Sequence, residues 1–171
     1  MAIPIIRFIS DLHLGHKNLA QNLRKFQDEF YHDEFIIEQW NRVVKSPKDI
    51  TYILGDVTME KIDSYLLLNR LRGVKHVVGG NHDLKQHSKE LLKYVDSISG
   101  MIDYKGFVLT HCPVHHTIVQ EKRGNIHGHL HSKHVYLPNG EIDNKYLNVS
   151  AECINYTPIT LEELLIKYNR T

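Results

Sequence analysis

Short apolar runs alternate with amphipathic stretches through the first half of the chain. Apolar residues dominate Ile3–Ser10, Ile50–Asp56 and the segment VKHVVGGNHD that begins at Val74, and each run predicts a strand inside a sheet. Between the first two runs, apolar residues on one face predict a helix from Glu34 to Lys45, with Asp33 as its N-cap. This alternation is typical of layered α/β folds.

Two shorter helices follow in the pattern. One begins after the capping residue Thr58 and ends at Gly73, because glycine is favoured just past the end of a helix. The other begins at Ser88. After Asp96 the spacing changes, and the segment SISGMIDYKGFVLTH predicts two strands joined by a turn at Lys105-Gly106.

The last third of the chain adds further strands and a closing helix. GNIHGHLH and KYLNVSAE predict strands, and TLEELLIKYN predicts a helix with Thr160 and Glu163 in capping-box spacing. Helix-linked strands followed by hairpins predict an α/β (α+β) fold with two packed sheets flanked by helices. Because no repeat, linker or low-complexity segment divides the chain, residues 1–171 are expected to form a single domain.

Composition and charge narrow the class of protein. The chain has 171 residues, of which 42% are hydrophobic and 24% charged, as in ordinary globular proteins. Its net charge of +1 provides no strong field for long nucleic acid, so extended nucleic-acid binding is not expected. No apolar run reaches the roughly 18 residues of a membrane span. The beginning lacks a signal-peptide pattern, which predicts a cytoplasmic protein without a membrane partner.

Two residue types stand out against this background. The chain has 13 histidines, and histidine is the commonest imidazole donor for metal ions. It has only two cysteines, Cys112 and Cys153, which suits a reducing compartment better than a disulfide framework. We expect these two to be buried free thiols rather than part of a shared zinc site.

The predicted strands share one feature, which is a polar cluster at the carboxyl end. The first three runs end in SDLH, LGDV and GGNHD, and two later ones end in LTHC and HGHLH. Parallel strands in layered folds present their carboxyl ends on one edge, where ligands bind. The residues that could meet there are Asp11, His13, Asp56, Asn81, His82, His111, His127, His129 and His131.

Spacing supports this convergence. Asp11 and His13 are two positions apart, as are His129 and His131, and such positions point to the same side of an extended chain. A glycine directly precedes the proposed ligand in each of three blocks, at positions 55, 80 and 128, where a loop needs tight or positive-φ backbone. Carboxylate, amide and imidazole donors together suit Mn, Fe, Ni, Co or Zn and are too rich in nitrogen for Ca or Mg.

The ordered blocks SDLH, LGD, GGNHD, THC and GHLH resemble the signature of the calcineurin-like metallophosphoesterases. The resemblance extends from Asp11 to His131, with Thr110 where a glycine usually stands. The stretches SDLHLGHKN and LNVSAECINYTPITLEEL are similar to those of short bacterial and phage-type predicted phosphoesterases. The resemblance implies a four-layer α/β/β/α sandwich of two mixed sheets and a centre of two divalent ions, with Mn favoured.

By position, the resemblance also implies a role for each residue. One ion would be held by Asp11, His13, Asp56 and His131. The other would be held by Asp56, Asn81, His111 and His129, with Asp56 bridging. His82 would face the substrate as general acid or phosphoryl-binding residue, with Asp83 behind it, and a hydroxide bridging the ions would attack the ester.

Counting charges favours a phosphate substrate. Two divalent ions, two carboxylates and a hydroxide leave a net charge of about +1 for an anionic phosphoryl group, and two metals lower the pKa of bound water from 15.7 toward about 7. Asn81 adds an oxygen ligand without further negative charge. We also expect His16 and Asn18, with Asn81, to contact the substrate.

Several alternatives stay open at this point. A pocket role for His115 or His116, and a supporting role for His127, are possible from spacing alone. A helical HD phosphohydrolase is disfavoured because His82 follows a strand exit. A non-catalytic scaffold of the same fold should lack ligands, and this chain lacks none. Among enzymes, a phosphatase, a cyclic-nucleotide diesterase and a nuclease acting on nucleic acid ends remain, with a small phosphoester or nucleotide as the expected substrate and no prediction of oligomeric state.

Overall fold

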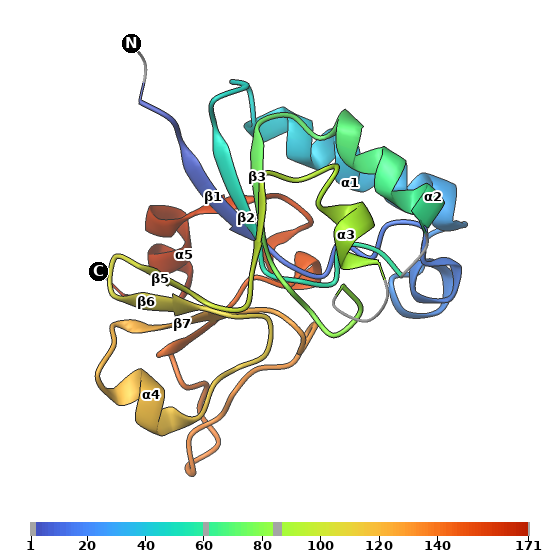
Figure 1. Cartoon of the computed structure of the whole chain (residues 1–171). Coiled ribbons are helices and arrows are strands. Elements are labelled where there is room, and N and C mark those ends of the chain that lie inside the picture. Colours follow the sequence, from blue (N-terminus) through green and yellow to red (C-terminus); the bar gives the residue numbers. More distant parts are fainter. Residues whose placement is uncertain (1–2, 60–61, 84–86, 171) are drawn as a thin grey trace.

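The first of two mixed sheets contains the strands from the amino-terminal half and one late strand (Figure 1). The protein is described by a computed structural model that covers residues 3–59, 62–83 and 87–170. The strand order is β4-β3-β2-β1-β9, with β9 antiparallel to β1 and the other pairs parallel. The strands are β1 (Ile6–Ile9), β2 (Ile50–Ile53), β3 (Val74–Val78), β4 (Ser97–Ser99) and β9 (Ile159–Thr160).

The second sheet has the order β5-β6-β7-β8, with β5 antiparallel to β6 and the remaining pairs parallel. Its strands are β5 (Ile102–Tyr104), β6 (Phe107–Leu109), β7 (Gly124–His127) and β8 (Tyr146–Asn148). The predicted class is therefore confirmed: two mixed parallel and antiparallel sheets with flanking helices.

Helices cover the outer sides of the sheets (Figure 1). The α-helices are α1 (Glu29–Val43), α2 (Ile62–Tyr65), α3 (Ser88–Leu91), α4 (His116–Gln120) and α5 (Leu161–Lys167). Shorter turns of other helix types are the π-helix η1 (Leu19–Leu23) and the 3₁₀-helices η2 (Leu66–Arg70) and η3 (Ala151–Ile154). The helices α1, α2 and α3 flank the first sheet, α4 lies against β7, and α5 packs beside β1 and β9.

Aromatic rings join the facing sides of the two sheets. The ring of Phe8 on β1 lies 5.3 Å from that of Tyr104 on β5 and 5.8 Å from that of Tyr52 on β2. On the helix side, Trp40 is fully buried and donates its indole N–H to the carbonyl of Arg72 at 2.9 Å. Both sheets therefore share one hydrophobic core, which fixes the position of their carboxyl ends relative to each other.

The helix boundaries differ from two of the predictions. Helix α1 begins at Glu29, and Asp28 is its N-cap, since its carboxylate accepts from the backbone N–H of Tyr31 at 2.9 Å. Asp33 is buried inside the helix instead, because its carboxylate is used by the Gly15 amide and the His32 ring. Thr58 is not a helix cap either: it pairs with Leu14 in a parallel bridge, and α2 begins at Ile62.

The predicted strands are present in the structure, and the segment from Ser97 contains one strand more than predicted. The segment from Ser97 forms three strands rather than two, because β4 pairs with β3 before the chain crosses to the second sheet. The turn at Lys105-Gly106 is confirmed, and both residues have positive φ. The capping box of Thr160 and Glu163 at the start of α5 is also confirmed.

Candidate metal centre

The loops after β1, β2 and β3 lie beside one another at one edge of the first sheet. Parallel pairing continues past the strands, because the Asp11 amide donates to the Gly55 carbonyl and the His13 amide to the Asp56 carbonyl, both at 3.0 Å. The backbone of His82, after β3, donates to Asp56 Oδ1 at 3.0 Å. The three clusters that the sequence separates are therefore in contact.

The second sheet meets this edge through backbone and side-chain hydrogen bonds. Ser10, directly after β1, pairs with Ser150 beyond β8 in a parallel bridge. The amide of His129, beyond β7, donates to Asp11 Oδ2 at 2.9 Å. The ring of His111, beyond β6, lies with Nδ1 2.8 Å from the Leu54 carbonyl oxygen. Because a carbonyl only accepts, Nδ1 donates its proton to it, and Nε2 is the ring nitrogen that faces the cluster.

Asp56 lies at the centre of the cluster. Its Oδ2 is 3.7 Å from His13 Nε2 and 3.4 Å from His111 Nε2. The same Nε2 of His111 is also 3.0 Å from Asn81 Oδ1 and 3.2 Å from His129 Nδ1. One carboxylate thus separates two groups of donors.

The remaining ligand candidates complete the first group. Asp11 Oδ1 is 3.8 Å from His13 Nε2, and the rings of His13 and His131 stack with centroids 5.4 Å apart. The donor atoms of Asp11, His13 and His131 all lie within 4.8 Å of one another, and so do those of Asp11, Asp56 and His111. The structure therefore brings together all seven residues expected as ligands, from five different loops.

Unsatisfied buried atoms show what this cluster is suited to hold. Asp11 is fully buried and His13 nearly so, yet Asp11 Oδ1 and both ring nitrogens of His13 find no hydrogen-bond partner among the described residues. Burying such groups without a partner costs about 1–3 kcal/mol each. Divalent ions would satisfy these donors, so the residues present fit a metal centre.

The backbone of the ligand loops is strained. Five of the proposed ligands have left-handed φ angles, which cost on the order of 1–3 kcal/mol each for residues other than glycine. Aspartate and histidine are among the residue types that tolerate this region best. Such strain concentrates at functional sites, where it aims side chains inward. The residues are Asp11 (57°), His13 (49°), Asp56 (53°), His129 (67°) and His131 (51°).

Glycines make room for the ligands, as the sequence predicted. Gly55 has a φ of +86°, and a Cβ there would lie 2.4 Å from His111 Nδ1. At Gly80 the obstacle is space rather than φ, since a Cβ would lie 2.3 Å from Asp56 Oδ1. A Cβ on Gly128 would lie 2.5 Å from Asp11 Oδ2. Any larger residue would push a ligand out of the cluster.

Electrostatics set the protonation of the central residues. Burial lowers the pKa of His13 to about 2, against the opposing effect of Asp56, so the ring is neutral. Burial also opposes the charge on Asp56, but its hydrogen bond and charge interaction with His111 outweigh burial and lower its pKa to about 2. The same pairing overcomes burial at His111 and raises its pKa to about 9. An ion bound there would replace that proton, since metal ligands must be deprotonated.

We had expected Asp83 to lie behind the His82 ring. In the structure its carboxylate holds two loops together. Its Oδ2 accepts from the backbone amides of Asp56 at 2.7 Å and Gly80 at 2.9 Å, and its Oδ1 accepts from the Val57 amide at 3.0 Å. Both oxygens are thus engaged by backbone, which ties the loop after β2 to the loop after β3. This arrangement makes Asp83 a positioning residue for Asp56.

The expected substrate-contacting residues fall in two groups. His82 lies at the open side, with its side chain 22% exposed, Nε2 3.9 Å from Asp56 Oδ2 and its ring 5.6 Å from that of His13. His16 also lies 5.6 Å from the His13 ring, measured between centroids. Asn18 is exposed at the start of η1, and its side chain makes no capping bond to that helix.

The three histidines left open by the sequence lie in different places. His127 is fully buried beneath the cluster, its Nδ1 2.8 Å from the Gly128 carbonyl oxygen, and burial lowers its pKa to about 4. His115 and His116 are exposed, with ring centroids 4.1 Å apart, and His115 caps α4 through the Thr117 amide. The first is held by the backbone of the loop that carries His129, and the other two lie at the start of a helix.

Sequence reasoning missed a buried polar network behind the first group of donors. Glu152 Oε1 lies 3.0 Å from His131 Nδ1 and 2.8 Å from Arg24 Nε, and these partners outweigh burial and lower its pKa to about 2. Arg24 also donates to the carbonyls of Asp11 and Leu12 and contacts the His32 ring. Glu152 follows β8 closely, so the rule of polar residues after strands could have found it.

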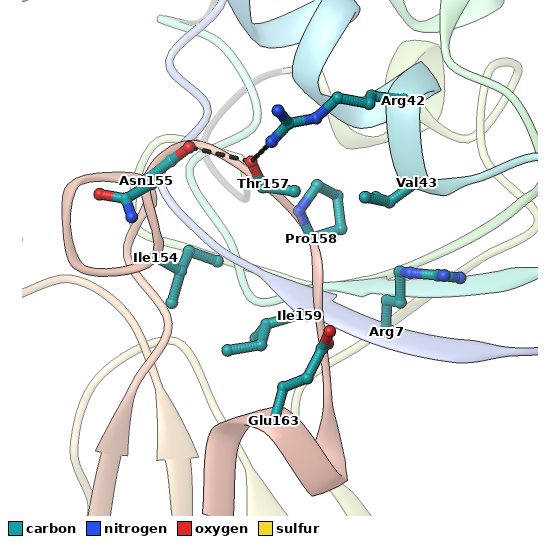
Figure 2. A pocket seen from close by; sticks show the side chains of 9 residues that line it. All are labelled: Arg7, Arg42, Val43, Ile154, Asn155, Thr157, Pro158, Ile159 and Glu163. Carbon is teal, nitrogen blue, oxygen red and sulfur yellow. Dashed lines mark hydrogen bonds between the residues drawn. The ribbon is translucent and has the colours of Figure 1, made fainter. Parts of the chain in front are cut away.

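A surface cavity of about 310 Å³ lies elsewhere and contains none of the expected site residues (Figure 2). Arg42 donates there to Thr157 Oγ1 at 3.4 Å, and that hydroxyl donates to the Asn155 carbonyl at 3.0 Å. Arg7 and Glu163 also line it. None of the described residues that line it belongs to the cluster of candidate metal donors.

The comparison with protein families identifies the class. The model of the family described as calcineurin-like phosphoesterase matches residues 5–163. The chain belongs to this family, and the resemblance of its five motif blocks is confirmed. Membership supports metal-dependent hydrolysis of phosphoesters as the general class of reaction, in keeping with the donor clusters described above.

Two further proteins are similar to this chain in sequence. The chain is 33% identical over 174 residues to the Methanocaldococcus jannaschii protein named "Uncharacterized protein MJ1445", covering 98% of this chain and 92% of that protein. It is 35% identical over 80 residues to the Gene 66 protein of Mycobacterium phage L5, covering 44% of this chain and 38% of the phage protein.

Two solved structures share the fold. The Aquifex aeolicus protein of unknown function AQ665 matches with a TM-score of 0.72 and 24% identity, covering 95% of this chain and 98% of that one. The Pseudomonas putida nuclease MPE matches with a TM-score of 0.51 and 16% identity, covering 80% and 66%. In the described ranges, no helix is long and apolar enough to cross a membrane.

Proposed function

We propose that the protein is a dinuclear metal-dependent phosphoesterase that hydrolyses phosphomonoesters or phosphodiesters. One observation carries this proposal. Candidate metal donors from the loops of both sheets lie close together, and several of their buried atoms have no hydrogen-bond partner among the described residues. One ion would be held by Asp11, His13, Asp56 and His131, and the other by Asp56, Asn81, His111 and His129.

The place of Asp56 supports its role as the bridging ligand. His13 belongs to the first set and His111 to the second, and Asp56 Oδ2 lies within 3.7 Å of a nitrogen from each. Asp11 is less central, because its Oδ1 lies 3.8 Å from Nε2 of His13, a member of the first set only, and its Oδ2 accepts from the His129 amide. When bound, two such ions would lower the pKa of water and clamp the attacking and leaving oxygens.

The protein's own residues would then handle the substrate and the proton. His82 is partly exposed beside the cluster while the proposed ligands Asp11, His13 and Asp56 are buried, so its ring lies where a phosphoryl oxygen or a leaving group would approach. In the first role it donates a hydrogen bond, and in the second it delivers a proton to the departing oxygen. Asp83 keeps the loops of Asp56 and His82 in register.

Substrate and metal preferences follow from the surroundings. His16 lies beside His13 and would contact the substrate together with Asn81, and the same role is proposed for Asn18. A net charge of +1 favours a small phosphoester or nucleotide over extended nucleic acid.

Mn is the proposed ion, with Fe, Ni, Co or Zn as substitutes. The free thiols of Cys112 and Cys153 are consistent with a cytoplasmic location.

Chelation followed by metal replacement tests the proposal. Protein treated with a chelator should lose hydrolysis of phosphomonoester and phosphodiester substrates and regain it on addition of Mn. A short nucleic acid with free ends belongs in the same panel, because it separates a nuclease from a small-molecule esterase. Full activity in protein verified to be free of metal would show that the two-metal mechanism is wrong.

A further inference from the structure

A thiol lies beside the second group of donors. The sulfur of Cys112 and ring nitrogens of His111 and His129 all lie within 4.8 Å of one another. Cys112 is exposed, which corrects the expectation of a buried thiol. The other thiol, Cys153, is partly buried and lies 3.1 Å from the His131 carbonyl oxygen, so its surroundings are different.

The spacing of these three donors suits one ion. Metal–nitrogen bonds of roughly 2.0–2.1 Å and metal–sulfur bonds of about 2.3 Å place two donors on one ion roughly 3–4 Å apart. His111 Nε2 and His129 Nδ1 are 3.2 Å apart, within that range. Cys112 follows His111 directly in the chain, so the same loop would deliver both donors.

We propose that the Cys112 thiolate is a further ligand of the second ion, which it biases toward thiophilic metals. This inference rests on the proposed dinuclear centre. On coordination the S–H bond breaks, its proton passes to solvent, and the sulfur lone pair binds the ion without change of oxidation state. Soft thiolate favours Zn or Co over Mn, whereas carboxylate and amide oxygens do not discriminate in this way.

Cobalt gives a direct readout, because a thiolate bound to Co(II) produces a charge-transfer absorption in the near ultraviolet and a thioether, imidazole or carboxylate does not. Metal-free protein would be titrated with Co(II) under nitrogen. The visible bands of Co(II) and elemental analysis report binding itself. Wild type and the matched control Cys153→Ser should both show the charge-transfer band, and Cys112→Ser should lose it while keeping the visible bands.

Competition between metals supplies a second measurement. After dialysis against equal concentrations of Zn and Mn, the Zn-to-Mn ratio bound by Cys112→Ser should fall at least about tenfold relative to wild type, the lower range for losing a contact that tunes a metal site. Cys153→Ser should keep the wild-type ratio.

The outcomes separate this inference from the proposed function. Cobalt bound to wild type without a charge-transfer band, or a band that persists in Cys112→Ser, would overturn the role of Cys112 and leave the dinuclear centre standing. Failure of wild type to bind any cobalt, manganese or zinc would overturn the dinuclear centre and the role of Cys112 with it.

Discussion

At the scale of single residues, the site combines strained backbone with side chains that lack partners. Aspartate and histidine occupy left-handed backbone positions, three glycines leave space beside the cluster, and the candidate donor atoms lie close together. The strained backbone lowers the stability of the metal-free protein, and the free energy of ion binding would compensate for this loss. Two substitutions test the division of labour among them.

Asp56→Asn should impair metal binding more than Asp11→Asn. Asp56 Oδ2 lies between His13 and His111, so its charge serves both ions, whereas Asp11 Oδ1 faces His13. Elemental analysis after dialysis should find both ions weakened in Asp56→Asn and the second ion retained in Asp11→Asn. Two ions per chain at wild-type affinity in Asp56→Asn would show that the bridging assignment is wrong.

His82→Ala should keep both ions and lose activity according to the leaving group. A nitrophenolate departs without a proton, so the loss there should be modest. An alkoxide needs protonation in the transition state, an effect of about 10² to 10⁴ in rate. The measurement is kcat/KM for both proteins across a leaving-group series in which chemistry limits the rate. Equal losses across the series would instead assign His82 to the phosphoryl oxygens, and loss of metal would make it a ligand.

At the scale of elements, short parallel strands place the loops that follow them at one edge of the sheet. The strands β1, β2 and β3 end three or fewer residues before their polar clusters, and the helices between them return the chain for the next parallel strand. Helix α1 matters most here, because its Asp33 side chain holds the Gly15 amide at the end of the first ligand loop. Its start at Asp28 is therefore part of the support for the site.

Asp28→Ala should destabilise the protein by about 1 kcal/mol, the usual cost of losing an N-cap, without changing metal content. The exposed Glu38→Ala on the same helix is the matched control, with an expected change within about 0.5 kcal/mol. Urea denaturation of metal-free protein measures both. An unchanged midpoint for Asp28→Ala would mean that the helix gains nothing from this cap.

At the scale of the whole molecule, the proposed centre would join two sheets that are held together by their shared core and by hydrogen bonds at the edge. The proposed ligands come from loops of both sheets, so ions would bind the folded chain and not the unfolded one. Binding and stability should therefore be linked.

Addition of Mn to metal-free protein should raise the melting temperature. At a free concentration 100 times the dissociation constant, one ion adds about 2.7 kcal/mol, which corresponds to roughly 5–10 °C for a chain of this size. Ca at the same concentration is the control and should act more weakly, because the donor set is rich in imidazole. An equal shift with both ions, or an undiminished shift in Asp56→Asn, would indicate binding elsewhere.

The sequence by itself determined the class of fold and predicted the candidate donors that the structure brings together. Alternating apolar runs marked the strands, and the polar residues at their carboxyl ends marked the ligand loops, because parallel strands share an edge. The capping box at Thr160 was also local and therefore predictable. Each of these signals lies within a few consecutive residues.

Only the tertiary structure decided which residues support the donors. Asp33 looked like a cap from its neighbours, yet it bonds Gly15, which is 18 positions away. Asp83 follows His82 in the chain but holds the amides of Asp56 and Val57. Glu152 contacts His131 directly and accepts a hydrogen bond from Arg24, which lies 128 positions away from it in the chain. These contacts join segments far apart in sequence, and a local pattern carries no information about which of them the packing of two sheets will bring together.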